Sequence, residues 1–329
     1  MSGVSELKPM RRAAALLISI LVSFSGTSAG QSYPSKPVRI IVPFSPGGVT
    51  DIIARTHAAK LAELWGQNVV VENRPGAGGS LGAAVVARAA PDGYLLLVHS
   101  SGYAINAAVN PQLPYDYRRD FVDVAPLGSQ PMVLVVSPNS NLKSVADLLA
   151  LARAKPGELT YGSAGIGSGA HFNGEKFRIA AGVEVLHVPY KGGSDAINDT
   201  MAGRLTFTFN TVTLALPFIR DGRLAALGVS SLRRSELLPA APPIAEAGIP
   251  GFEFTFWNGL WAPAATPAAV VERINRDLMR IMDLPDVLER FAKLGAEPMR
   301  MTSAQFARFV KSEIDDSARI AQAAGIKAQ

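Results

Sequence analysis

Short apolar segments, each followed by a loop of small residues and then a helical pattern, constrain the fold of this chain most. Residues 38–42 are apolar except for Arg39, residues 43–51 have the loop sequence PFSPGGVTD, and residues 50–64 have a helical pattern. This order is typical of a strand, a loop and a helix in an α/β domain. Within the loop, Gly47 and Gly48 allow the backbone to approach a ligand closely.

The loop at residues 43–51 is a candidate anion site. The first turn of a helix has backbone N–H groups without acceptors inside the helix, and the helix dipole favours negative charge there. Thr50 or Asp51 could cap this helix. The alternative interpretation is a tight strand-to-helix turn that contacts no ligand.

The same alternation continues along the chain, which favours mostly parallel sheets with helices on both faces. We predict further strands at residues 68–72, 94–99, 132–136, 160–163, 184–188, 205–209, 224–229 and 253–261. We predict further helices at residues 80–90, 144–154, 170–181, 195–202, 213–220, 268–282, 286–294 and 303–324. Residues 110–123 and 231–251 are rich in proline or charge, and we expect loops there.

Two successive α/β series indicate two lobes. If the C-terminal helices return to the first lobe, two chain crossings connect the lobes, as in a hinged clamshell with a cleft between them. We therefore predict that residues 30–130 and 231–329 form lobe 1, and that residues 131–230 form lobe 2.

Residues 1–29 have the pattern of a secretory signal peptide. Arg11 and Arg12 precede an apolar run at residues 13–24, and small residues lead to a cleavage site after about Ala29. The run is too short for a permanent membrane anchor. A buried helix in a cytosolic protein is the alternative. We predict export, with no membrane insertion of the mature chain.

Charge and cysteine content exclude several classes of function. Removal of Glu6, Lys8, Arg11 and Arg12 with the signal would change the formal net charge from +5 to +3. The chain has no stripe of Lys and Arg interleaved with aromatic residues, so we do not expect nucleic acid as a partner. It also has no Cys, which excludes disulfides and thiolate chemistry.

The second α/β series contains its own loop of small residues. Residues 161–171 have the sequence YGSAGIGSGAH, in which serine hydroxyls and glycine amides could hold a carboxylate. The alternative is a turn between a strand and a helix. Residues 165–170 also match the dinucleotide-binding fingerprint, but they are not on the first strand–helix unit, and the match is weak.

Other polar residues also follow predicted strands, where open α/β sheets bind ligands. Lys191, in the loop VPYKGGSD at residues 188–195, could pair with a carboxylate or be a solvated charge. Asn210 and Ser101 follow two further strands. Trp257 could line the cleft or pack in the core.

The candidate ligand-binding residues come from these strand-end positions. They are Phe44, Ser45, Gly47, Gly48, Val49, Thr50, Asp51, Ser101, Ser163, Ala164, Gly165, Ser168, Tyr190, Lys191, Gly192, Asn210 and Trp257. The four His residues are scattered, no serine has the G-x-S-x-G context, and no P-loop is present. We therefore predict a protein without enzymatic activity, metal or cofactor. The alternative is an exported dehydrogenase or hydrolase that uses the loop at Gly165.

Six ordered motifs give the chain a resemblance to a known family. They are PFSPGGVTD at residues 43–51, ENRPGAGG at 72–79, LPYD at 113–116, YGSAG at 161–165, VPYKGG at 188–193 and WNGLWAP at 257–263. The chain resembles the Bug-type substrate-binding proteins of tripartite tricarboxylate transporters over essentially the whole mature sequence. Tyr117 and Asp123 depart from the family, which tends to have Pro there, but both lie outside the predicted ligand loops.

The resemblance implies a periplasmic binding protein with two lobes, a type II-like clamshell that captures a small organic carboxylate. It implies that backbone amides, small polar groups and ordered water grip the carboxylate, from loops that match residues 44–51 and 163–168 here. It also implies delivery to permease subunits in the inner membrane. A sensory protein that passes the liganded form to a receptor is the alternative.

Overall fold

The computed structural model describes residues 33–110 and 112–326. The chain divides into two units, residues 1–35 and 36–329, and the fold described below is that of the second unit. The predicted signal peptide at residues 1–29 lies outside the described residues. Within the described part of the chain, no helix combines the length and the apolar character that a membrane span requires.

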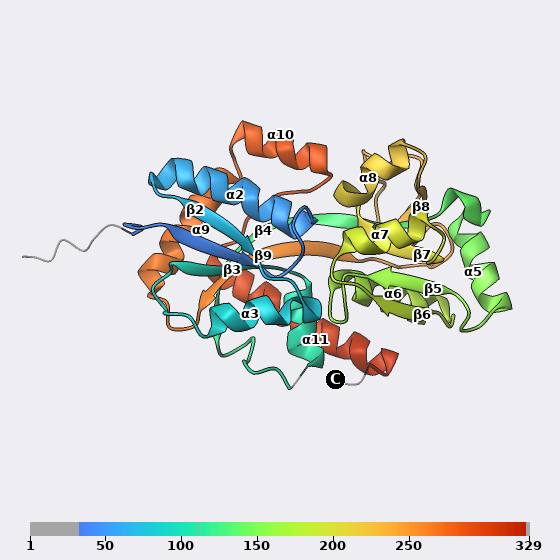
Figure 1. The fold of residues 1–329 in the computed structure, drawn as a ribbon, viewed down its shortest axis with the longest axis horizontal. Coiled ribbons are helices and arrows are strands. Elements are labelled where there is room, and N and C mark those ends of the chain that lie inside the picture. Colours follow the sequence, from blue (N-terminus) through green and yellow to red (C-terminus); the bar gives the residue numbers. More distant parts are fainter. Residues whose placement is uncertain (1–32, 111, 327–329) are drawn as a thin grey trace, which may run out of the picture. The chain divides into compact units, whose positions relative to one another are not determined.

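The first group contains five strands, of which four run in one direction and one runs in the opposite direction. β1 (Val38–Val42) lies between β2 (Val69–Asn73) and β3 (Leu95–Ser100), and all three are parallel. β3 pairs antiparallel with β9 (Thr255–Pro263), and β9 pairs antiparallel with residues 121–131 of β4 (Phe121–Val136). Figure 1 shows β4 and β9 running side by side.

The second group of strands is built on the remainder of β4. Residues 132–136 pair antiparallel with β7 (Phe207–Thr211), and residues 133–136 pair antiparallel with β8 (Ala225–Val229). β5 (Thr160–Ser163) is parallel to β7 and to β6 (Leu186–Pro189). β4 is therefore common to both groups. The proposed lobe boundaries near residues 130 and 231 stay a prediction.

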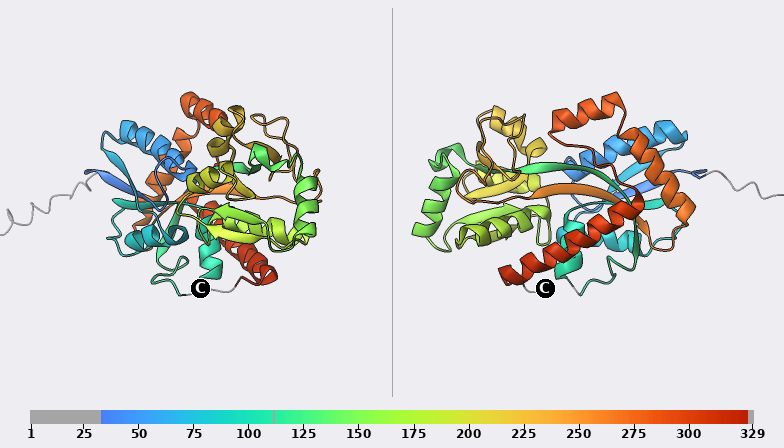
Figure 2. Two further views of the ribbon diagram at one scale, coloured as in Figure 1. Left: turned by 45° about the vertical axis from the view of Figure 1, so that its right-hand side comes forward. Right: turned by 180° about the vertical axis from the view of Figure 1, so that it is seen from behind.

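Helices follow most of the strands, as the alternating pattern predicted. They are α2 (Val49–Trp65), α3 (Ser80–Ala87), α4 (Gly102–Val109), α5 (Val145–Ala154), α6 (Gly169–Ala181), α7 (Gly193–Met201), α8 (Val212–Arg220), α9 (Ala268–Ile281), α10 (Pro285–Leu294) and α11 (Ser303–Ala324). Short 3₁₀ turns occur at Ala77–Gly79 and Pro138–Ser140. α11 packs on α4 and β4 and also contacts α6 (Figure 2). The mixed α/β fold class is confirmed.

Local signals explain several helix ends. Gly66 ends α2 in the left-handed conformation, and Ser144 starts α5 by accepting a hydrogen bond from the amide of Asp147. At the start of α2, however, the N-cap residue is Gly48, without a side-chain cap. The prediction that Thr50 or Asp51 caps this helix is therefore wrong.

One α-helix and part of one strand were not predicted from the sequence. One is the short helix α4, and the other is residues 121–131 of β4, part of which we expected to be a loop. Pro126, Gly128 and Pro131 interrupt the apolar pattern of this strand, and its pairing with β9 shifts register between Asp123 and Ala125 and again between Pro126 and Gly128. The bulges allow this strand to contain proline and glycine, which are unfavourable within a regular strand.

Each group of strands contributes to an apolar cluster. In the first, the rings of Tyr103 and Trp261 stack with centroids 4.0 Å apart, and Trp257 and Phe306 pack beside them. The second cluster contains Val133 and Val135 of β4 with apolar residues of α7 and α8. These clusters fix the positions of the strands. The loops of the candidate site follow the carboxyl ends of those strands.

Candidate functional site

In the part of the chain that the structure describes, four helices begin around one small cavity, which we call the inner pocket. Its volume is about 60 Å³, room for one group of roughly the size of a carboxylate. It is lined by Phe44, Ser45, Gly48, Val49, Thr50, Ser100, Met132, Ala164, Ser168, Gly169, Ala170, Gly192, Gly193, Ser194, Asn210, Thr211, Leu214 and Phe256. None of these described residues is Lys, Arg or His.

The helix starts give the inner pocket a positive electrostatic character without a cationic side chain. The N-cap residues of α2, α6, α7 and α8 are Gly48, Ser168, Gly192 and Thr211, and all four line the pocket. Each N-terminus carries a partial positive charge and backbone N–H groups with no acceptor in the helix. The arrangement is suited to an anion.

The glycine N-caps leave the first turns of α2 and α7 open to a ligand. Ser168 caps α6 with its own hydroxyl, which accepts a hydrogen bond of 3.2 Å from the amide of His171. Gly48 and Gly192 have no side chain to do the same. A Cβ at Gly192 would lie 3.1 Å from Ser45 Oγ, so glycine also makes room for the neighbouring loop.

Thr211 and Asn210 add polar side chains at the end of β7. Thr211 is 3 % exposed, and its Oγ1 atom has no hydrogen-bond partner among the described residues. Asn210 donates from Nδ2 to Thr208 Oγ1 at 3.1 Å. A buried hydroxyl without a partner is unfavourable, which makes Thr211 a candidate donor to a ligand. Sequence reasoning selected Asn210 and missed Thr211, although Thr211 is the next residue of the same strand end.

Asp51 anchors the loop that precedes α2. Its carboxylate accepts hydrogen bonds of 3.0 Å from the amide of Gly47, from Arg55 Nε and from Asn73 Nδ2. Burial acts to raise the pKa of Asp51, but the hydrogen bonds from Arg55, Gly47 and Asn73 together hold it below its ordinary value. Asp51 therefore remains ionised, and its hydrogen bonds fix the loop at residues 43–51.

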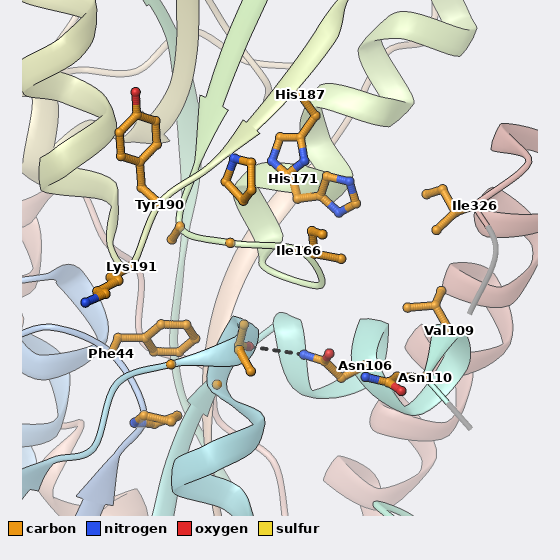
Figure 3. Close-up of a pocket in the computed structure, with 18 of the residues that line it drawn as sticks. Phe44, Asn106, Val109, Asn110, Ile166, His171, His187, Tyr190, Lys191 and Ile326 are labelled. Atoms are coloured by element: carbon orange, nitrogen blue, oxygen red, sulfur yellow. Dashed lines mark hydrogen bonds between the residues drawn. The ribbon is translucent and has the colours of Figure 1, made fainter. Parts of the chain in front are cut away.

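A larger cavity, the outer cleft, adjoins the inner pocket, and Phe44 and Ala164 line both. Its volume is about 970 Å³. Tyr190, Lys191 and Gly165 from the predicted set line it, and Figure 3 shows Lys191 and Phe44 on one side with Val109 and Ile326 on the other. Lys191 is exposed and does not line the inner pocket.

Two histidines also line the outer cleft. Burial lowers the pKa of His171 to about 4 and that of His187 to about 3, so both are neutral at pH 7. His171 Nδ1 accepts a hydrogen bond of 3.3 Å from the amide of Gly167. His187 Nε2 lies 2.6 Å from Ser163 Oγ. The histidines therefore support the loop at residues 163–168.

The contact between Ser163 and His187 was not predicted from the sequence. Ser163 is 1 % exposed, and its Oγ also accepts a hydrogen bond of 3.1 Å from the amide of Gly165. It lines neither the inner pocket nor the outer cleft. A nucleophilic serine must reach a substrate, and this hydroxyl is instead part of the loop's internal hydrogen bonding.

The remaining predicted site residues lie outside both cavities. Gly47 is exposed beside the inner pocket, and Ser101 is buried next to β9, where its amide donates to the carbonyl of Trp257. Trp257 is 1 % exposed, packs against Phe309, and donates from its indole nitrogen to Glu313 Oε2 at 2.8 Å. The structure thus places Trp257 in the core. Among the residues described, no His, Asp and Glu cluster could hold a metal ion.

Comparison with known proteins shows the family. The model of the tripartite tricarboxylate transporter family receptor matches residues 53–326. BugT of Bordetella pertussis is 36% identical over 94% of this chain and 97% of its own length. A protein from the tcbD–tcbE intergenic region of Pseudomonas sp. (strain P51) is 41% identical over 91% of this chain and 90% of its own.

Solved structures similar to this chain support the same family assignment. The chain is similar to R. palustris Rpa4515 with adipate (TM-score 0.87, 34% identity, 90% of this chain and 100% of that one). It is also similar to the periplasmic binding protein BugD (TM-score 0.85, 32% identity, 90% and 100%). MatC from Rhodopseudomonas palustris with bound malate gives a TM-score of 0.83 with 32% identity, over 88% and 99%. The resemblance seen in the motifs is confirmed, and the chain belongs to the tripartite tricarboxylate transporter receptors as a Bug-type member.

Proposed function

We propose that this protein is a periplasmic receptor that binds a small organic carboxylate in the inner pocket. The observation that carries the proposal is the convergence of four helix N-termini on a pocket lined by neutral side chains. A carboxylate there would accept charge-assisted hydrogen bonds from backbone amides, which are stronger than bonds between neutral groups.

The pocket supplies donors from both groups of strands. The first turn of α2 follows β1, whereas α6, α7 and α8 follow β5, β6 and β7. The carboxylate would lie between these helix starts and accept a further hydrogen bond from Thr211 Oγ1. The remainder of the solute would extend past Phe44 and Ala164 into the outer cleft, beside Tyr190 and Lys191.

Two structural relatives support a carboxylate as the ligand class. Rpa4515 was solved with adipate and MatC with malate, and both ligands are dicarboxylates. The absence of a full ion pair in the pocket suits a protein that must release its ligand, because a desolvated ion pair is held strongly once it is formed. We infer a role in binding, without catalysis.

The proposed function includes export of the protein to the periplasm and delivery of its solute to a permease. Residues 1–29 would direct the chain to the periplasm, and the liganded protein would pass its solute to permease subunits of a tripartite tricarboxylate transporter. The family assignment and the structural relative BugD, a periplasmic binding protein, support this location and partner.

The proposal is tested by a thermal-shift screen of residues 30–329 against di- and tricarboxylates, acidic amino acids and aromatic acids. A ligand at a hundred times its dissociation constant adds about 2.7 kcal/mol to the free energy of unfolding. Neutral sugars and nicotinamide cofactors serve as the comparison set. A shift with these compounds and with no carboxylate would contradict the proposal.

A variant then tests where the carboxylate binds. Gly48→Asp should abolish binding, since it introduces a negative charge and a side chain at the start of α2. Asn68→Asp adds the same charge at an exposed residue directly before β2 and should bind as the parent does. Isothermal titration gives the affinities, and circular dichroism checks the fold. Unchanged affinity in a folded Gly48→Asp protein would refute this placement.

A further inference from the structure

Two glycine-containing loops from different strand groups contact each other directly, beside the outer cleft. Residues 76–79 follow β2, and residues 164–168 follow β5. A Cβ at Gly78 would clash with the carbonyl oxygen of Ile166, and one at Gly165 would lie 3.4 Å from the amide nitrogen of Gly78. Both glycines have positive φ angles, +61° and +107°. Backbone thus packs on backbone at this point.

The side chain of Asn106 joins these two loops. It projects from α4, and its Nδ2 atom lies within hydrogen-bond distance of the carbonyl oxygens of Gly78 (3.1 Å), Gly167 (3.2 Å) and Gly102 (2.8 Å), so its two N–H groups are shared among three acceptors. Figure 3 shows this side chain with one of the hydrogen bonds. Gly78 and Gly102 belong to the first strand group, whereas Gly167 belongs to the second. The side chain is 2 % exposed, so water competes little for these bonds.

We propose that Asn106 is a positioning residue for solute binding, because it holds the two strand groups together before the solute arrives. The inner pocket is formed by loops from the same two groups, so the contact at Asn106 preorganises it. The consequence for affinity rests on the proposed function. When only a fraction of the protein is competent to bind, the apparent dissociation constant rises in inverse proportion to that fraction.

Asn106→Asp removes the donor and keeps the shape of the side chain. A carboxylate cannot donate, and it would face the three carbonyl oxygens that the amide now binds. The equilibrium ratio of joined to separated loops should fall about fivefold, as expected for the loss of the hydrogen bond to Gly167, which connects the two strand groups. Asn68→Asp is the matched control, since it makes the same change at an exposed residue that lines neither cavity.

The joined state can be measured without any solute. The chain has no cysteine, so Val85→Cys and Leu186→Cys give two specific labelling sites, one in each strand group and both exposed. Electron–electron double resonance on dialysed protein then reports the distance between the labels. We expect a longer or broader distribution in Asn106→Asp and the parent distribution in Asn68→Asp. An unchanged distribution in Asn106→Asp would overturn the proposal.

Titration of the carboxylate found in the screen separates this role from direct contact. We expect Asn106→Asp to raise the dissociation constant by up to about fivefold, and saturating solute to restore the parent label distance. A raised dissociation constant with an unaltered solute-free distance would mean that Asn106 contacts the solute, which overturns the proposal. If no carboxylate binds, the proposed function fails, and the distance measurement still decides the role of Asn106. Asn106→Ser replaces Asn106→Asp if circular dichroism shows that the latter is unfolded.

Discussion

Replacement of Thr211 by Val should weaken solute binding while it stabilises the free protein. Thr211 Oγ1 is buried without a partner among the described residues, and Thr211 starts α8 without a side-chain cap. Val has nearly the same shape and fits the end of a strand well. The free energy of unfolding should rise by about 1 kcal/mol, the lower end of the penalty for an unsatisfied hydroxyl, because water can reach the pocket.

The effect on binding has the opposite sign. A hydrogen bond to a charged group contributes about 1.5–3 kcal/mol, so its loss should raise the dissociation constant roughly 10- to 150-fold. Isothermal titration measures the affinity, and urea denaturation of the solute-free protein measures stability. Replacement of a buried hydroxyl that has no partner in the free or the solute-bound protein should change only the stability.

Thr266→Val provides that comparison. Thr266 is also buried with an unpartnered Oγ1, but it lines neither the inner pocket nor the outer cleft. This variant should gain stability to a similar extent and bind the solute as the parent does. If Thr211→Val also bound with parent affinity, the hydroxyl would not contact the carboxylate, and the proposed position of the anion would be wrong.

Two further predictions concern charge. Because hydrogen bonds lower the folded-state pKa of Asp51, its contribution to stability is present above about pH 4 and is lost as the pH falls through the folded-state pKa. Between about pH 5 and pH 2 the parent should therefore lose more unfolding free energy than Asp51→Asn, as followed by urea denaturation. Lys191 is exposed outside the inner pocket, so Lys191→Gln should change the dissociation constant less than about threefold in isothermal titration at 0.15 M salt. A tenfold loss would show that Lys191 holds the carboxylate.

Regular periodicity made most of the fold predictable. β1 and β5 have the bounds that the alternation of strands and helices predicted, and α2 differs by one residue at each end. α4 and the first part of β4 were not predicted, for different reasons. α4 is short, and β4 contains Pro126 and Pro131 within a bulged strand. Bulges depend on the partner strand, which is distant in sequence, so a local pattern cannot reveal them.

The sequence predicted the loops that form the candidate site better than it predicted the individual residues that line it. Glycine N-caps such as Gly48 and Gly192 follow from the position of small residues between a strand and a helix. Thr211 was missed because a threonine at a strand end is common, and only its lack of a partner distinguishes it. Trp257 lies in the core because the alternation of side chains along β9 directs it toward Phe306 and Phe309, which belong to a distant helix.

Glycines in these loops have two separate roles, which the sequence pattern does not distinguish. Gly48 and Gly192 have φ angles of −72° and −161°, which other residues also adopt, so glycine is needed there for space and open amides. Gly78 and Gly165 have positive φ angles and lie where two backbones meet. In the proposed site, the loops rich in small residues therefore serve both as the ligand cradle and as the contact that holds that cradle together. On this proposal, an alanine in the first pair would act on the ligand, whereas an alanine in the second would strain the contact between the loops.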